Sequence, residues 1–284
     1  MSTTTANQTT LFDAPGPRAR RRIRILTVLS AVAIVAVLAY AVYIFGVNGQ
    51  LKPEKWEALG QWPIIKYLLG GLGDTMLAAA AAAAIALPLG AVLALARLSE
   101  NRLIRWIGTA IIEFFRSIPL LLLIYIFFIA LPRYGVNPDL YWKLVIPIGL
   151  CSGATIAEVF RAGVLALPKG QTEAALAIGM TRGQIYLNVI FPQAIRLVMP
   201  SLLAQVVILI KDTTLGYVVS YSELQFSAKV LVANTGYLIQ TYLTVTVVFI
   251  LVNLAIARTA DLWTKRQRRR YLNAGKAVAP TVTM

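Results

Sequence analysis

Ionisable and polar side chains within apolar runs are the residues of this chain most able to do chemistry. Glu158 and Arg161 are three residues apart and can pair on one face of a helix. Ser152 and Thr155 precede Glu158 at the same spacing, which predicts a polar stripe on that helix. Such a stripe inside hydrocarbon is favourable only against protein or water. Ser152, Thr155 and Glu158 are therefore candidates for lining a pathway through a membrane, with hydrogen bonding to a neighbouring helix as the alternative.

Other charges lie near the ends of apolar runs. Arg116 follows the start of one run, and Lys211 and Asp212 lie at the end of another. Ionisable groups in membrane spans are costly and are usually paired or functional. Arg116, Arg161, Lys211 and Asp212 are accordingly expected to be structural or gating charges. A structural ion pair is the plainer interpretation of Glu158 with Arg161.

The composition excludes several kinds of active site. The chain has 284 residues, with Cys151 as its only cysteine and no histidine. An internal disulfide, a cysteine/histidine zinc site and a histidine-based triad are therefore excluded, and no metal or catalytic site is predicted. No Gly-x-x-x-x-Gly-Lys-Ser/Thr segment is present, so we expect no cofactor on this chain. If ATP powers the protein, another chain must bind ATP and Mg²⁺.

The balance of residues predicts an all-α integral membrane protein. Hydrophobic residues make up 58% of the chain and charged residues 14%, against about a quarter charged in soluble domains. The net charge of +15 does not indicate nucleic-acid binding, because the basic residues lie between apolar spans. Six membrane-spanning helices are predicted, with the following approximate ranges: 25–47, 69–96, 107–131, 144–165, 197–220 and 237–257. Residues 1–24 and 264–284 are predicted to be a disordered basic amino terminus and a basic tail.

The loop charges predict the orientation. With the amino terminus in the cytoplasm, the cytoplasmic segments hold 20 of the 27 Lys and Arg residues and the outer loops hold 6. This asymmetry satisfies the positive-inside rule. Both termini and the loop at 168–192 are therefore expected in the cytoplasm.

Residues 168–192 carry the turn and cap signals of two short helices. Pro168 and Gly170 interrupt the preceding helix, and Gly179 is expected to stop a helix over 171–178. Thr181 with Gln184 is a capping-box pattern, which predicts a second helix that runs to Phe191 and bends or ends at Pro192. Glu173, Ala174 and Ala175 are expected to be presented for close packing. A plain connector is the alternative to a docking element.

Several of these stretches resemble one known family. The pattern Glu173-Ala174-Ala175, Gly179 and Pro192 resembles the "EAA" loop of type I ABC importer permeases. The flanks are similar to the polar amino acid (histidine/glutamine/glutamate) permeases. These flanks are Phe115–Leu120, Glu158–Gly163, Pro168–Gln171, Pro192–Arg196 and Lys211–Leu215. The extra first span and basic ends are similar to the glutamate-uptake permeases of actinobacteria.

The resemblance implies a six-span permease whose last five spans, within 69–263, form a MetI-like type I core. It implies that Gln171, Glu173, Ala174, Ala175, Gly179 and Pro192 belong to a loop that couples to an ATPase. The implied partners are ABC ATPase subunits, a second permease or a second copy, an extracytoplasmic solute-binding protein, membrane lipid and an amino acid substrate, best guess glutamate. The implied location is the inner membrane of a bacterium. A secondary amino acid transporter without an ATPase is the alternative.

Overall fold

A computed structural model of the chain describes residues 16–277, which divide into one unit ending at Ala58 and a second starting at Leu59. In the first unit, helix α1 spans Pro17–Val47 and is long and apolar enough to cross a membrane. The helix thus includes the arginines at 18–24, where disorder was predicted, because Pro17 suits a first helical turn. The rest of the predicted disordered segment, 1–15, lies outside the described residues. Helix α2 spans Pro53–Leu59.

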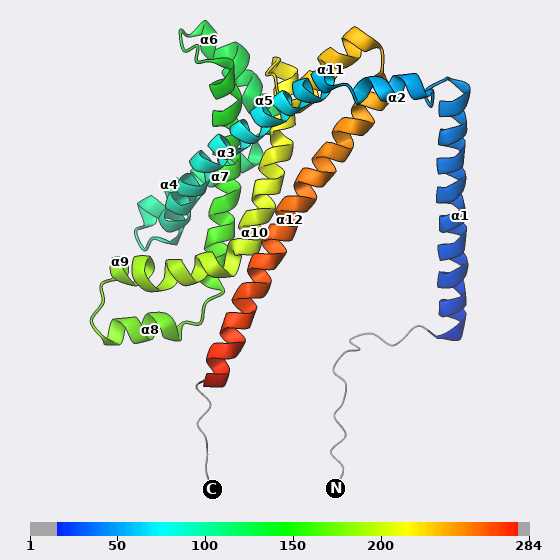
Figure 1. Ribbon diagram of the computed structural model, residues 1–284. Helices are drawn as coiled ribbons and strands as arrows, with labels where there is room; N and C mark the ends of the chain where they lie inside the picture. Colours follow the sequence, from blue (N-terminus) through cyan, green and yellow to red (C-terminus); the bar gives the residue numbers. More distant parts are fainter. Residues whose placement is uncertain (1–15, 278–284) are drawn as a thin grey trace. The chain divides into compact units, whose positions relative to one another are not determined.

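Regular structure within 16–277 is helical throughout, as Figure 1 shows. The first half of the second unit contains α3 (Trp62–Leu98), α4 (Arg102–Ser117), α5 (Leu120–Tyr125), the π-helix η1 (Ile126–Ala130), α6 (Leu131–Arg133) and α7 (Leu140–Leu165). The second half contains α8 (Gly170–Ala177), α9 (Arg182–Gln184), the π-helix η2 (Ile185–Ile190), α10 (Phe191–Asp212), the 3₁₀ helix η3 (Thr213–Val219), α11 (Leu224–Thr235) and α12 (Leu238–Ala277).

Five helical segments of the described chain are long and apolar enough to span a membrane, or up to six if a bent pair counts as one span. That pair corrects the predicted single span at 107–131. Helix α4 ends at Ser117, and the segment from Leu120 to Arg133 is bent away from it by 94°. Pro119 lacks an amide hydrogen and disfavours helical geometry at Ile118, which is extended at φ −82° and ψ 128°.

Helix α7 lies at the centre of the second unit and packs most extensively on α3. Ala78, Ala82 and Ala86 of the alanine-rich stretch are fully buried. A Cβ on Gly90 would lie 2.6 Å from a methyl group of Ile156. Small residues therefore bring the α3 and α7 backbones close together, which is a common way for membrane helices to associate.

Two further boundaries differ from the prediction. Helix α3 starts at Trp62 and runs unbroken through Pro88 and Gly90 to Leu98. Helix α12 continues to Ala277, so the tail predicted at 264–284 is helical as far as the described chain reaches. Residues 278–284 lie outside the described part.

Candidate functional site

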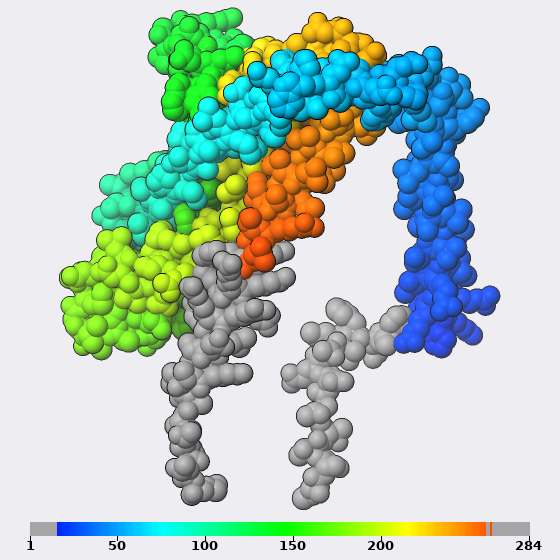
Figure 2. All heavy atoms as spheres, in the orientation of Figure 1, coloured from blue at the N-terminus to red at the C-terminus, as the bar shows by residue number. Residues whose placement is uncertain are grey.

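The segment 168–192 forms a folded lobe at one end of the second unit, here called the loop end (Figures 1 and 2). Helix α8 ends at Ala177, and Gly179 follows with φ +80°, a backbone conformation that favours glycine. The Thr181 backbone N–H donates to Gln184 Oε1 at 2.9 Å, and the Gln184 N–H donates to Thr181 Oγ1 at 3.5 Å. The predicted turn at Gly179 and the predicted capping box are both present.

Of the bend or end expected at Pro192, the end is not found, and α9 and α10 run in different directions in Figure 1. The π-helix η2 leads directly into α10, and helical structure continues from Arg182 to Val219. Pro192 directly follows the π-helical turn, so its missing amide hydrogen falls where the π-type hydrogen bonds give way to the α-helical pattern. The second helix of the loop is therefore continuous with a candidate membrane span.

A small apolar core holds the loop together. Ala175 is 5% exposed and packs with Ile185 and Ile190. Glu173 and Ala174 are exposed. The two alanines thus differ in environment: Ala175 closes the fold of the loop, and only Ala174 remains at the surface.

Apolar side chains also extend outward from this lobe. Ile178 is 78% exposed, and Leu176 and Leu187 are exposed as well. A folded element that exposes large apolar residues beside a carboxylate has the composition of a protein-docking surface. Gln171 contributes differently, since its Oε1 accepts a hydrogen bond from Gln193 Nε2 at 3.2 Å and so joins α8 to α10.

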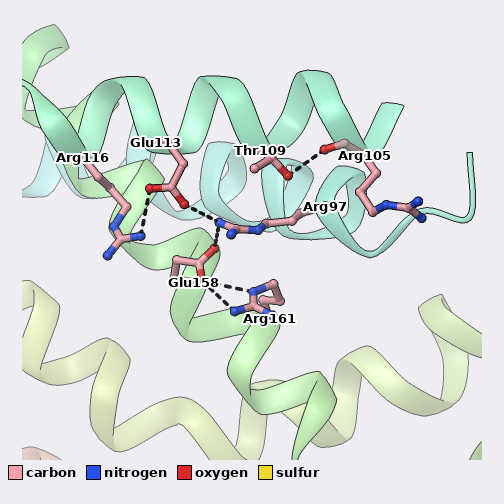
Figure 3. A network of polar contacts seen from close by, with 7 residues as sticks. All are labelled: Arg97, Arg105, Thr109, Glu113, Arg116, Glu158 and Arg161. Atoms are coloured by element: carbon pink, nitrogen blue, oxygen red, sulfur yellow. Dashed lines mark hydrogen bonds and ion pairs between the residues drawn. The ribbon is translucent and has the colours of Figure 1, made fainter. Parts of the chain in front are cut away.

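A cluster of five charged side chains joins α3, α4 and α7 (Figure 3). Arg97 donates to Glu113 Oε1 at 3.1 Å and pairs with Glu158 Oε1. Arg161 donates through Nε to Glu158 Oε2 at 3.0 Å, as its i, i+3 spacing predicted. Arg116 lies 3.7 Å from the second Glu113 oxygen. Glu158 is therefore bound by two arginines, one of them from another helix.

The predicted polar stripe is unevenly covered. Ser152 is 6% exposed, whereas Thr155 and Glu158 are partly exposed. The Thr155 hydroxyl donates to the Cys151 carbonyl oxygen at 3.2 Å, one helical turn earlier. Thr155 and Glu158 thus remain accessible from outside the helix packing, and Ser152 lies within it.

Lys211 and Asp212 end α10. The Lys211 side chain is exposed and Asp212 is half-buried. The carbonyl oxygen of Lys211 accepts a hydrogen bond from the Thr214 hydroxyl at 2.6 Å, where α10 passes into η3. A gating role for these two charges stays a prediction.

Sequence reasoning missed the central position of Arg97 in the charge cluster. It also missed an ion pair between Arg182 of α9 and Glu100 of the turn after α3. Both contacts join segments that are far apart in the chain. The sequence does indicate that charged groups among apolar spans need partners. It does not indicate which residues form the pairs.

Comparisons with known proteins agree with this geometry. Residues 86–270, more than half of the chain, match the family model "Binding-protein-dependent transport system inner membrane component". The glutamate transport system permease protein GluD of Corynebacterium glutamicum is 34% identical over 81% of this chain and 84% of its own length. The probable glutamine ABC transporter permease protein GlnM of Bacillus subtilis is 32% identical over 72% and 94%.

Solved structures show the same fold. A crystal structure of an amino acid ABC transporter with histidines has a TM-score of 0.68 at 26% identity, covering 73% of this chain and 97% of that one. The MetNI methionine ABC transporter, in an inward-facing form, has a TM-score of 0.61 at 22% identity over 72% and 98%. The chain belongs to the family of binding-protein-dependent transport system inner membrane components, the non-catalytic permease subunits of ABC importers.

Proposed function

We propose that this permease carries glutamate or a related polar amino acid into the cell and that its 168–192 loop docks onto an ATPase subunit. The observation that carries the proposal is the loop itself, which is folded around Ala175 and exposes Glu173 with large apolar residues. Because the loop runs without interruption into α10, a displacement of the docked loop reaches a membrane span. ATP and Mg²⁺ are bound by the partner, and this chain performs no bond chemistry.

The remaining partners follow from the family. An ATPase and a binding protein are implied by membership, and we infer that the permease core pairs with a second permease or a second copy. The loop end and both termini lie in the cytoplasm, in agreement with the 20-to-6 distribution of Lys and Arg. The solute-binding protein then meets the opposite end.

The choice of glutamate rests on two kinds of support. The similar GluD and GlnM proteins carry glutamate and glutamine in their names. In this chain, Glu158 is paired with Arg97 and Arg161, so an acidic substrate passing Thr155 does not meet an unpaired carboxylate. Three arginines and two glutamates in the cluster leave one net positive charge, which attracts anions.

Reconstitution tests the proposal. The permease is co-expressed with the ATPase and permease genes adjacent to its own and assembled in proteoliposomes with the neighbouring binding protein. We expect the ATPase to co-purify, and we expect labelled L-glutamate to accumulate only with ATP. Unlabelled L-glutamine and L-arginine serve as competitors. Accumulation without ATP, or a permease that retains no ATPase, contradicts the docking function; uptake of another amino acid contradicts only the choice of glutamate.

A further inference from the structure

The turn between α3 and α4 is held in one conformation by its own hydrogen bonds. The Asn101 carboxamide oxygen accepts from the backbone of Leu103 at 2.9 Å and so caps α4. Arg105 donates to the Ser99 carbonyl oxygen at 2.9 Å. Glu100 lies between Ser99 and Asn101, and its side chain is 69% exposed. This turn therefore presents one carboxylate at a fixed place.

Arg182 meets that carboxylate from an equally fixed position. It is the first residue of α9 and lies within the Thr181–Gln184 capping box. Its guanidinium pairs with Glu100 Oε1. The pair joins the 168–192 loop to a part of the chain that precedes α4, α5 and α7.

The two segments face each other across a hollow of about 310 Å³ that is lined by Leu95 and Leu98 on one side and by Gly183 and Tyr186 on the other. Beside this hollow, the Glu100–Arg182 ion pair is a direct contact between the two segments. Tyr186 itself packs against the apolar core of the loop, so Arg182 belongs to the same rigid lobe as α8.

On the other side of the pair, the α3–α4 turn is tied to the charge cluster. Arg97 lies one helical turn before Glu100 and binds Glu113 of α4 and Glu158 of α7. Glu158 is the residue that ends the partly exposed face containing Thr155. A displacement of the turn therefore also moves α3, α4 and α7 around that face.

We propose that Glu100 and Arg182 form a second coupling contact, a positioning pair that makes the α3–α4 turn move together with the 168–192 loop. The inference rests on the proposed docking of that loop. Movement of the docked loop then reaches α3, α4 and α7 through the turn, in addition to α10 through the chain itself. Because both side chains are well exposed, the pair contributes little to stability. Its loss should uncouple transport without unfolding the protein.

The test measures L-glutamate taken up per ATP hydrolysed in the reconstituted importer. We expect Glu100→Gln and Arg182→Gln each to lower this ratio by about two- to fivefold, which is the range that an exposed ion pair can supply. The exchange Glu100→Arg with Arg182→Glu should restore most of it, which a purely structural role of either side chain would not. Arg102→Gln, at an exposed arginine that begins α4 directly after the turn, is the matched control and should keep the wild-type ratio.

Wild-type ratios in both single variants would overturn the proposal, as would a charge exchange that performs no better than the single variants. A second measurement uses Glu100→Cys with Arg182→Cys in a Cys151→Ser background. A short bis-maleimide should link the two positions, as seen by mass spectrometry of the peptides, and should raise the uptake ratio again. A linked protein that stays inactive would mean that the contact must break, contrary to the proposal. Failure of the ATPase to co-purify with the wild type refutes the docking function instead.

Discussion

At the scale of single residues, Arg97 differs from the other arginines of the charge cluster. It binds carboxylates from two helices and is only 21% exposed on its side chain, as is Glu158. Arg116 lies 3.7 Å from one carboxylate, and both partners are at least two-fifths exposed. Charge-assisted hydrogen bonds with little solvent around them are the stronger class, so the two arginines should differ in their contribution to stability.

Arg97→Gln should lower the free energy of unfolding by about 1.5–3 kcal/mol, since two carboxylates lose a charged donor. Arg116→Gln, the control, should lower it by less than about 1 kcal/mol. Thermal unfolding of the detergent-purified proteins measures both. Equal destabilisation by the two substitutions would contradict the central place given to Arg97.

Thr155→Val keeps the shape of the side chain and removes the hydroxyl from the partly exposed face of α7. If that hydroxyl contacts the substrate, uptake should weaken by on the order of 1 kcal/mol, or about fivefold, with ATPase assembly unchanged. Ser152→Ala is the control, because Ser152 is covered by helix packing. Wild-type uptake of every amino acid by the Thr155→Val protein would assign this face to helix packing.

At the scale of elements, the bend at Gly179 decides how α8 and the following helix meet. A Cβ at this position would touch no other atom of the described chain within 4 Å, but the backbone φ of +80° is unfavourable for most residues. Substitutions therefore act through backbone strain, about 1–2 kcal/mol for a left-handed conformation, or through a docked partner.

Gly179→Asp should abolish transport while the permease still inserts, because a charge is placed at the docking bend. Gly179→Asn is the matched control of equal size, and asparagine tolerates the left-handed conformation. It should retain more uptake than the aspartate variant. ATP-dependent uptake in vesicles and permease content by immunoblot are compared; near-normal uptake with Gly179→Asp would remove the coupling role of this bend.

The start of α11 carries a buried carboxyl group outside the candidate spans. Glu223 is fully buried and accepts hydrogen bonds from the backbone of Gln225 and Phe226, both at 2.7 Å. Burial raises its pKa from 4.5 to about 7, although the two backbone bonds act in the opposite direction. Beside it, Leu224 N–H donates to the Thr75 hydroxyl at 3.1 Å, which attaches α11 to α3.

Because the folded-state pKa of Glu223 lies above its unfolded value, folding favours the neutral carboxyl. The resulting stabilisation is fully present below about pH 4.5 and is lost as the pH rises through about 7, amounting to at most about 3 kcal/mol. Because the folded-state pKa of Glu223 is the higher one, we expect the melting temperature to fall as the pH rises from 5 to 8. The Glu223→Gln substitution should make the melting temperature depend less on pH. Asp139→Asn, at an exposed carboxylate, should leave the slope unchanged; an equal slope in the Glu223→Gln protein would refute the assignment.

At the scale of the whole molecule, the distribution of basic residues predicts the orientation in the membrane. Single cysteines at Glu173 and Asp139, both exposed, are introduced into a Cys151→Ser background. In intact cells an impermeant thiol reagent should label the Asp139 position and leave the Glu173 position unlabelled until the membrane is opened. Labelling of the Glu173 position from outside would reverse the topology.

The sequence by itself determined the features that depend on local chemistry. Apolar runs of spanning length, the capping box at Thr181, the turn at Gly179 and the pairing of Glu158 with Arg161 all involve residues close in the chain. Backbone and side-chain preferences act over a few residues, so these features are visible without the fold. Several such motifs together were also sufficient to indicate the protein family.

Only the tertiary structure decided which distant residues meet. Arg97 with Glu158 and Glu100 with Arg182 are brought together by the packing of α3, α4 and α7 and by the placement of the loop. The same packing covers Ser152 and Ala175 while leaving Thr155 and Glu173 accessible, a difference that the sequence pattern did not predict. The surrounding chain likewise decides what a proline does. Helix α4 ends before Pro119 and a sharp bend follows, whereas the π-helical turn before Pro192 leads on into α10.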